Sequence, residues 1–146
     1  MSKSNTFENE ILAHIFNNAN IANIGDATGI RGSTAAGSLY LSLHTADPGE
    51  AGTATTSEIS YTGYARKAVA RSAGGFTVTG NAVTLTVDVD FGKMTGGTGG
   101  TVTHFAVVKE LSGASVVLYK GPVSPTIAVA NGIIPRLETG TTITEE

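Results

Sequence analysis

The sequence predicts a mainly β fold: an antiparallel β-sandwich or jelly-roll-like barrel with one short N-terminal α-helix. Three observations support this class. Only the N-terminal stretch has helical spacing of apolar residues, most later segments alternate apolar and polar residues, and Gly, Pro and Asn punctuate them. Roughly eight short strands separated by turns are typical of sandwiches and jelly rolls. The sequence has no internal repeat, which argues against a solenoid.

The helix is predicted within residues 1–18. Asn5 is a good N-cap and Glu8 follows at the spacing of a capping box, while Asn17-Asn18 ends the helix. Glu8 is expected to point away from the apolar face. That face consists of Phe7, Ile11, Leu12, Ile15 and Phe16.

Two roles remain open for this helix. It covers one end of its own sandwich, or it is an arm that docks on a neighbouring protein. In the second case Phe7, Ile11 and Ile15 are candidate interface residues.

Residues 19–37 are rich in Asn, Ala and Gly and are predicted to form a loop, anchored by Ile21, Ile24 and Ile30. The remainder, 38–146, is predicted to form the sandwich, so that the whole chain is a single domain.

The first predicted strand, 39–45, is expected to be half-buried. Leu39, Leu41 and Leu43 share one face, and Tyr40, Ser42 and His44 share the other. Asp47-Pro48-Gly49 stops it. The polar segment 46–60 is then expected to be mobile or held by a partner, so that its deletion leaves the domain folded.

The clearest strand pattern spans 83–91 and follows a hairpin turn at Gly80-Asn81. Five apolar residues share one face of this predicted strand, and Asp88 and Asp90 lie on the other. Further strands are predicted at 102–109, 115–120, 126–130 and 137–144. Pro122 and Pro125 are expected to flank a short segment, because neither fits inside a central strand.

Composition excludes several functions. The chain has no cysteine, so it forms no disulfide and no thiolate metal site. A net charge of −3 lacks the basic footprint of a nucleic-acid-binding protein, and no membrane span or export signal is expected. Charged residues make up only 14% of the chain, which indicates either Thr- and Ser-rich strand surfaces or a surface covered by subunit contacts.

No catalytic, cofactor-binding or metal site is predicted, and the protein is expected not to be an enzyme. His14, His44 and His104 are isolated, and Asp88 and Asp90 are best explained as a solvated strand face. Tyr61, Tyr64 and Arg66 are candidate interface residues that form a small recognition patch; alternatively, Tyr64 lies in the core.

Four segments carry a resemblance to a known family. They are residues 5–9 (NTFEN), 38–52 (SLYLSLHTADPGEAG), 61–72 (YTGYARKAVARS) and 121–137 (GPVSPTIAVANGIIPRL). In these segments the chain resembles short tailed-bacteriophage virion structural proteins, often labelled tail fibre or minor structural proteins. The resemblance implies a protein of the virion, assembled in the host bacterial cytoplasm.

Within that class, the expected function is capsid decoration, in which the protein cements the head by binding across capsomer junctions. A compact chain without repeats or heptads suits this role better than a fibre shaft. The alternative is a tail or tail-fibre component. A third hypothesis is a glycan-binding adhesion module with an exposed platform drawn from Tyr40, Tyr61, Tyr64 and Tyr119. Expected partners are the major capsid protein or tail proteins and one or two further copies of the chain, with neither nucleic acid nor membrane.

Overall fold

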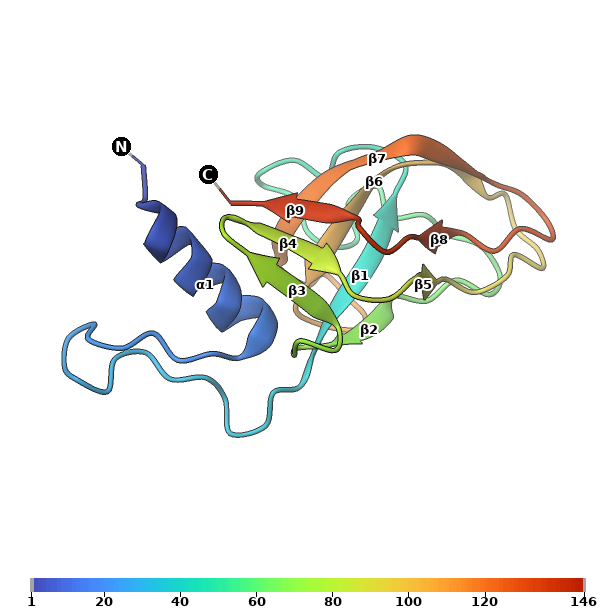
Figure 1. The fold of residues 1–146 in the computed structure, drawn as a ribbon. Coiled ribbons are helices and arrows are strands. Elements are labelled where there is room, and N and C mark those ends of the chain that lie inside the picture. Colours follow the sequence, from blue (N-terminus) through green and yellow to red (C-terminus); the bar gives the residue numbers. More distant parts are fainter. Residues whose placement is uncertain (1, 146) are drawn as a thin grey trace. The chain divides into compact units, whose positions relative to one another are not determined.

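The computed structural model describes residues 2–145, which form two compact units (Figure 1). Unit 1 comprises the chain up to Ser38, the segment Val69–Asp88 and the chain from Glu138 onward. Unit 2 comprises Leu39–Ala68 and Val89–Leu137. Each unit is therefore assembled from stretches that are distant in sequence.

Unit 1 begins with helix α1, Asn5–Asn17. Its N-cap is Ser4, whose extended backbone lets its hydroxyl accept a hydrogen bond from the Phe7 amide at 3.4 Å. The predicted N-cap, Asn5, is therefore wrong by one residue. The helix ends as predicted, because Asn18 adopts the left-handed conformation with φ of 57°.

The buried face of α1 consists of Glu8, Leu12 and Phe16, spaced one turn apart. The prediction that Glu8 points outward is wrong. Phe7 remains 36% exposed, and Ile11 and Ile15 are half-buried. The predicted apolar face of the helix is therefore only partly buried.

The sheet of unit 1 has the order β3-β4-β9, with strands Phe76–Thr79, Ala82–Leu85 and Thr142–Thr144, all antiparallel to their neighbours. The predicted hairpin is confirmed: Thr79 pairs with Ala82, and Gly80-Asn81 forms the two-residue turn. Helix α1 packs on β3 and β4. Its Phe16 ring meets Phe76 edge to face, with centroids 4.9 Å apart.

The predicted continuous strand 83–91 is wrong. Strand β4 ends at Leu85, and β5 is only Val89–Asp90, in the other unit. Between them Val87 is 53% exposed, and the Asp88 carboxylate accepts hydrogen bonds from the Thr139 amide at 2.7 Å and its hydroxyl at 2.8 Å. At this break the Asp88 carboxylate is thus bound to Thr139, and the alternating burial pattern of the sequence is not followed.

The larger sheet has the order β2-β1-β6-β7, with strands Lys67–Ala70, Ser38–His44, Gly100–Val108 and Val117–Val129. Strand β6 is antiparallel to both β1 and β7. A separate antiparallel pair joins β5 to β8, Arg136–Leu137. The fold is thus mainly β and sandwich-like, as predicted, and its antiparallel sheets do not close into a barrel.

Strand β1 departs from the predicted half-buried pattern, because Ser42 and His44 are fully buried together with Leu41 and Leu43. Two strands predicted at 115–120 and 126–130 are instead the single strand β7, which contains Pro122 and Pro125. This strand lies at the edge of its sheet, and its pairing with β6 is interrupted between Pro122 and Ile127, so that Pro125 lies in a bulge.

The segment 46–60 is held by its own unit. Ala54 is buried against Ala106 and Val108, Thr53 bridges to Val116, and the Ile59 amide donates to the Leu43 carbonyl at 2.9 Å. It is therefore part of the packed body of unit 2, and the expectation that this segment is mobile or held by a partner is wrong.

Within residues 2–145, no helix has the length and apolar character needed to cross a bilayer.

Candidate functional site

A network of buried and half-buried polar groups in unit 2 is built around the Glu58 carboxylate. Its Oε1 accepts hydrogen bonds from the Tyr64 hydroxyl at 2.9 Å and from Arg66 Nε at 2.8 Å. Its Oε2 accepts from Arg66 Nη2 at 2.7 Å. Arg66 also donates to the Glu110 and Gly113 carbonyls, so its guanidinium ties the 110–113 turn to the segment that carries Glu58.

A second buried pair lies on β1. The Ser42 hydroxyl is 2.8 Å from His44 Nε2, and His44 Nδ1 is 2.9 Å from the Thr56 carbonyl. Because a carbonyl only accepts, Nδ1 carries the proton and Nε2 accepts from Ser42. Both side chains are fully buried, so a substrate in solution cannot reach this serine–histidine pair. Its structural effect is the hydrogen bond that joins β1 to the Thr56 carbonyl.

Burial controls the acid–base behaviour of this interior. Desolvation lowers the pKa of His44, with the Thr56 hydrogen bond and the Glu58 charge opposing the shift. Burial likewise raises the pKa of the Tyr64 hydroxyl, which is held between the Leu43 amide and Glu58. Both groups are therefore neutral at pH 7 and serve as hydrogen-bonding partners.

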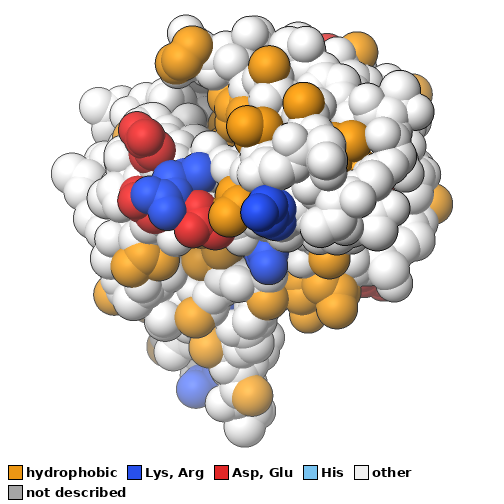
Figure 2. All heavy atoms as spheres, turned by 90° about the vertical axis from the view of Figure 1, so that its right-hand side faces the viewer, with side chains coloured by type: hydrophobic (Ala, Val, Ile, Leu, Met, Phe, Trp, Pro, Cys, Tyr) orange, Lys and Arg blue, Asp and Glu red, His pale blue; other side chains and the backbone are white. Residues whose placement is uncertain are grey.

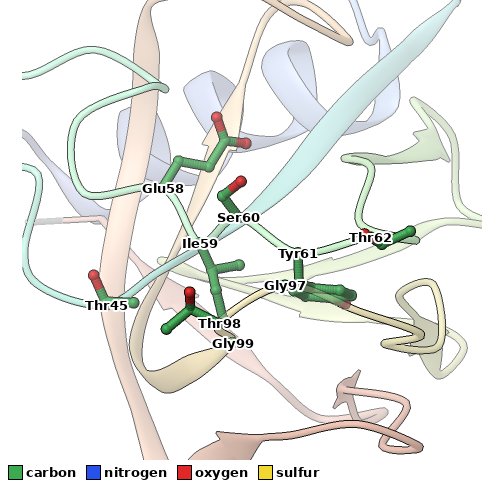
Figure 3. Close-up of a pocket in the computed structure, with 9 residues that line it drawn as sticks. All are labelled: Thr45, Glu58, Ile59, Ser60, Tyr61, Thr62, Gly97, Thr98 and Gly99. Atoms are coloured by element: carbon green, nitrogen blue, oxygen red, sulfur yellow. The ribbon is translucent and has the colours of Figure 1, made fainter.

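A pocket of about 650 Å³ opens on the surface of unit 2. Its walls come from the end of β1, the segment before Gly63 and the glycine-rich loop before β6 (Figure 3). The lining residues are Thr45, Glu58, Ile59, Ser60, Tyr61, Thr62, Gly97, Thr98 and Gly99. Figure 3 shows the Glu58 carboxylate pointing away from Thr45 and Thr98. Its two oxygens accept the hydrogen bonds of Tyr64 and Arg66.

Three of the predicted interface residues meet inside unit 2. The Tyr61 and Tyr64 rings lie 5.4 Å apart, and Tyr64 stacks on Phe91 at 6.1 Å. Tyr61 and Arg66 are buried, and Tyr64 is half-buried. This arrangement matches the alternative that places Tyr64 in the core, and it leaves no exposed patch. The tyrosine platform expected for glycan stacking is not exposed either, since Tyr40 and Tyr119 are also half-buried.

The other predicted residues are distributed over both units. Phe7, Ile11 and Ile15 lie on α1 of unit 1. The Asp88 carboxylate accepts a hydrogen bond from the Thr139 amide. Asp90 instead forms an ion pair with Arg136, with 2.6 Å between Oδ1 and Nε. Residues 2–145 contain no group of three or more His, Asp or Glu side chains placed to hold a metal ion.

Sequence reasoning missed Glu58, the centre of the buried network. The available signal was weak: Glu58 and Glu50 are the only acids in the polar stretch after Pro48, and Arg66 follows Glu58 by eight residues. An acidic residue a few positions before an alternating segment, such as Glu58, is too common a pattern to indicate a buried ion pair.

The described surface carries few charges and several exposed apolar side chains. On the face in Figure 2, most charged groups gather in one cluster where acidic and basic side chains adjoin, and apolar side chains are scattered across the rest. In unit 2, Ile133 and Ile134 directly follow the turn at Asn131-Gly132 and are 43% and 52% exposed. Such adjacent exposure is a feature of contact surfaces.

The fold and this interior define a small, mainly β protein of sandwich-like architecture whose buried polar groups are paired within the chain. The family model described as Podophage GP4 fiber I protein gp80 matches residues 2–145, and the chain belongs to this family. The match confirms the resemblance to short tailed-phage virion structural proteins and identifies the virion as the protein's location. No curated protein matches the chain.

Proposed function

We propose that this chain is a non-catalytic structural component of the podophage tail-fibre assembly, without a cofactor, and that it acts through contacts with other virion proteins. The observation that carries this proposal is the family match, which spans residues 2–145 and names a fibre protein. The proposed partners are tail proteins of the same phage and further copies of this chain, assembled in the host cytoplasm.

The side-chain chemistry supports a structural role. The strongest acid–base constellation, Ser42 with His44, is buried, and the Glu58 carboxylate is neutralised by Arg66. The surface instead offers contact groups, including Phe7 on α1 and the pair Ile133 and Ile134. A low charge content reduces the cost of covering such a surface with another protein.

The strand dimensions favour a short joining element over a fibre shaft. The longest strand, β7, has 13 residues. At about 3.3 Å per residue it extends only about 43 Å. The chain also lacks the sequence repeat that lengthens a shaft.

Capsid decoration is the second candidate. The same short strands and uncharged surface suit a cement protein that binds the major capsid protein across capsomer junctions, as a dimer or trimer. Apolar burial contributes roughly 25 cal/mol per Å², so many weakly bound copies can stabilise a shell.

The experiment begins with purified virions that are separated into heads and tails and probed by immunoblot. Recovery with the tail fraction supports the fibre role, and recovery with heads supports decoration. Absence from both fractions contradicts a virion role.

The contact surface is tested by complementing a deletion phage with the double variant Ile133→Ser and Ile134→Ser. We expect reduced incorporation into particles, with unchanged solubility and thermal unfolding of the isolated protein. Thr126→Ser, an exposed position on β7, is the matched control and should incorporate normally. Normal incorporation of the double variant would exclude this turn as a contact.

A further inference from the structure

We infer that the loop 18–33 of unit 1 is a preformed docking arm, whose exposed Ile24 and Ile30 enter an apolar socket on a tail protein other than this chain. This inference rests on the proposed function and adds to it the segment that makes the contact and the kind of partner that it fits. The loop has a closed base, an ordered interior and an apolar tip, and each of these properties supports the role.

The loop 18–33 is not needed to connect α1 to β1, because its two ends are joined to each other. Asn18 Nδ2 donates to the Ser33 carbonyl at 2.8 Å, and the Ser33 amide donates back to Asn18 Oδ1 at 2.7 Å. Arg71 contacts both sides of this closure, through the Ile15 carbonyl and the Ser33 hydroxyl. Figure 1 shows the chain leaving the end of α1, running out and doubling back before β1. The loop is therefore an excursion of the Ω-loop kind, a class that frequently carries function.

Hydrogen bonds inside the loop fix its conformation. Ile21 and Ile30 exchange two amide-to-carbonyl hydrogen bonds of 2.8 Å and form an antiparallel pair. Near the tip, Asp26 Oδ1 accepts from the amides of Thr28 at 2.8 Å and Gly29 at 3.1 Å. Gly29 has φ of 62°, and a Cβ there would overlap the Ile21 carbonyl oxygen, so only glycine fits. A loop that is already ordered loses little conformational entropy when it binds a partner.

The tip of the loop exposes apolar side chains. Residues 22–28 are all exposed, and Ile24 and Ile30 are 41% and 43% exposed. The prediction that these two isoleucines anchor the loop to the body is therefore wrong, whereas Ile21 is buried as predicted. A rigid loop cannot turn such side chains inward, so their surface leaves water only when a partner covers it.

The charges of the loop define the rim of the socket. Arg31 follows Ile30, is exposed and forms no ion pair within residues 2–145. The other charged residue of the loop is Asp26, whose Oδ1 already binds the amides of the loop itself. The arm therefore fits a protein surface with an apolar socket for the isoleucines and a carboxylate at its rim for Arg31.

The two pockets described on unit 2 do not provide such a socket. The larger pocket is lined mainly by Thr, Ser and Gly. The smaller one, of about 270 Å³, is bordered by the ion pair of Lys120 with Glu50 at 3.2 Å. Neither is an apolar socket with a free carboxylate, which favours a different tail protein over a second copy of this chain.

The size of the tip indicates how the arm acts. Its residues 22–31 are far fewer than the roughly 20–30 residues that each side contributes to a stable interface between separate proteins. The arm is therefore one of several contacts of the chain in the particle, and avidity makes it effective there.

The test is a competition for incorporation. Cells infected by the deletion phage produce equal amounts of the unmodified chain and of the double variant Ile24→Ser and Ile30→Ser, and mass spectrometry measures the ratio of the two forms in purified particles. We expect the unmodified chain to be enriched about tenfold. Leu111→Ser, which removes a 54% exposed leucine from unit 2, is the matched control and should be incorporated as well as the unmodified chain.

Equal incorporation of the folded double variant would overturn the inference, as would an equal loss for Leu111→Ser. If the double variant fails to fold, residues 22–29 are replaced by Asn-Gly. Because Ile21 and Ile30 form an antiparallel pair, a two-residue turn can close the shortened loop between them, and the same enrichment is expected.

Photo-crosslinking identifies the partner. Benzoylphenylalanine in place of Ala27, an exposed tip residue, should link the chain in irradiated particles to one tail protein, and the same label at Leu111 should not give that product. Crosslinks only to a second copy, or none in particles that contain the labelled chain, would overturn the inference. Both results leave the unmodified chain in the tail fraction, so the proposed fibre role fails only if that chain is missing there.

Discussion

Arg66 and Glu58 form a two-pronged ion pair inside unit 2, with Nε to Oε1 at 2.8 Å and Nη2 to Oε2 at 2.7 Å. Their side chains are only 3% and 14% exposed. The Tyr64 hydroxyl and two backbone carbonyls complete the hydrogen bonding. The pair connects the wall of the pocket to the turn that precedes β7.

Replacing Arg66 by alanine is expected to destabilise the protein by about 3–5 kcal/mol, because it leaves the Glu58 charge without its buried partner. Urea denaturation measures this loss. Arg136→Ala is the matched control: it removes another two-pronged pair, with Asp90, in which both side chains are 48% exposed. Equal losses in the two variants would show that burial does not determine the importance of the Arg66 pair.

Arg71 is expected to hold the end of α1. Its guanidinium donates to the carbonyls of His14 and Ile15, both at 2.5 Å, and to the Ser33 hydroxyl at 3.2 Å. Arg71→Ala should cost about 1.5–3 kcal/mol, because two helix-terminal carbonyls lose a charged donor. Hydrogen exchange should accelerate over 14–20. Arg31→Ala, at an exposed position in the same unit, should leave exchange unchanged; acceleration there too would contradict a specific role for Arg71.

His44 should make stability depend on pH. Its folded-state pKa is lowered from about 6.5 mainly by burial, while Glu58 opposes the shift and Arg66 and His104 add to it. The stability is fully present above pH 6.5. It falls as the pH drops below 6.5, because the unfolded chain takes up a proton that folded His44 resists, and the loss ends at the folded pKa.

Urea midpoints measured from pH 8 to pH 5 provide the test. The unmodified chain should lose stability below about pH 6.5. His44→Gln should flatten that part of the curve even if it lowers stability overall. An unchanged slope in the variant would assign the pH dependence to another group.

Asp88 is expected to set the break between β4 and β5. Asp88→Ala removes both Thr139 hydrogen bonds and should cost about 1–2 kcal/mol. Exchange protection should fall at the Thr139 amide, and Asp88→Asn should restore part of it. Full protection of Thr139 in Asp88→Ala would show that other contacts impose the break.

The features that the sequence predicted well are local. The Gly80-Asn81 turn and helix α1 depend on neighbouring residues, and both were confirmed. The break near Asp88 could not be predicted, because the hydrogen-bond partner of Asp88, Thr139, lies 51 residues away. For the same reason β7 was expected as two strands: whether Pro122 is tolerated depends on the strand being at an edge, which only the assembled sheet determines.

The candidate site was predicted only in part. Tyr61, Tyr64 and Arg66 were predicted as an interface patch, whereas the structure buries Tyr61 and Arg66 inside unit 2 and half-buries Tyr64. Glu58, the partner of Tyr64 and Arg66, was not predicted, since two opposite charges eight residues apart have no periodic signature. Burial of His44 was also missed, because alternation along β1 predicts one polar face, whereas the Thr56 carbonyl and Ser42 satisfy the imidazole inside the unit.

The most direct test of the central claim, a structural role in the fibre assembly, is the number and place of copies in the intact virion. Quantitative mass spectrometry of purified particles, together with cryo-electron microscopy of particles carrying a tagged chain, measures both. The fibre role predicts a low copy number, with density at the tail. Hundreds of copies on the head would contradict it in favour of capsid decoration, and absence from the particle would contradict any structural role in the virion.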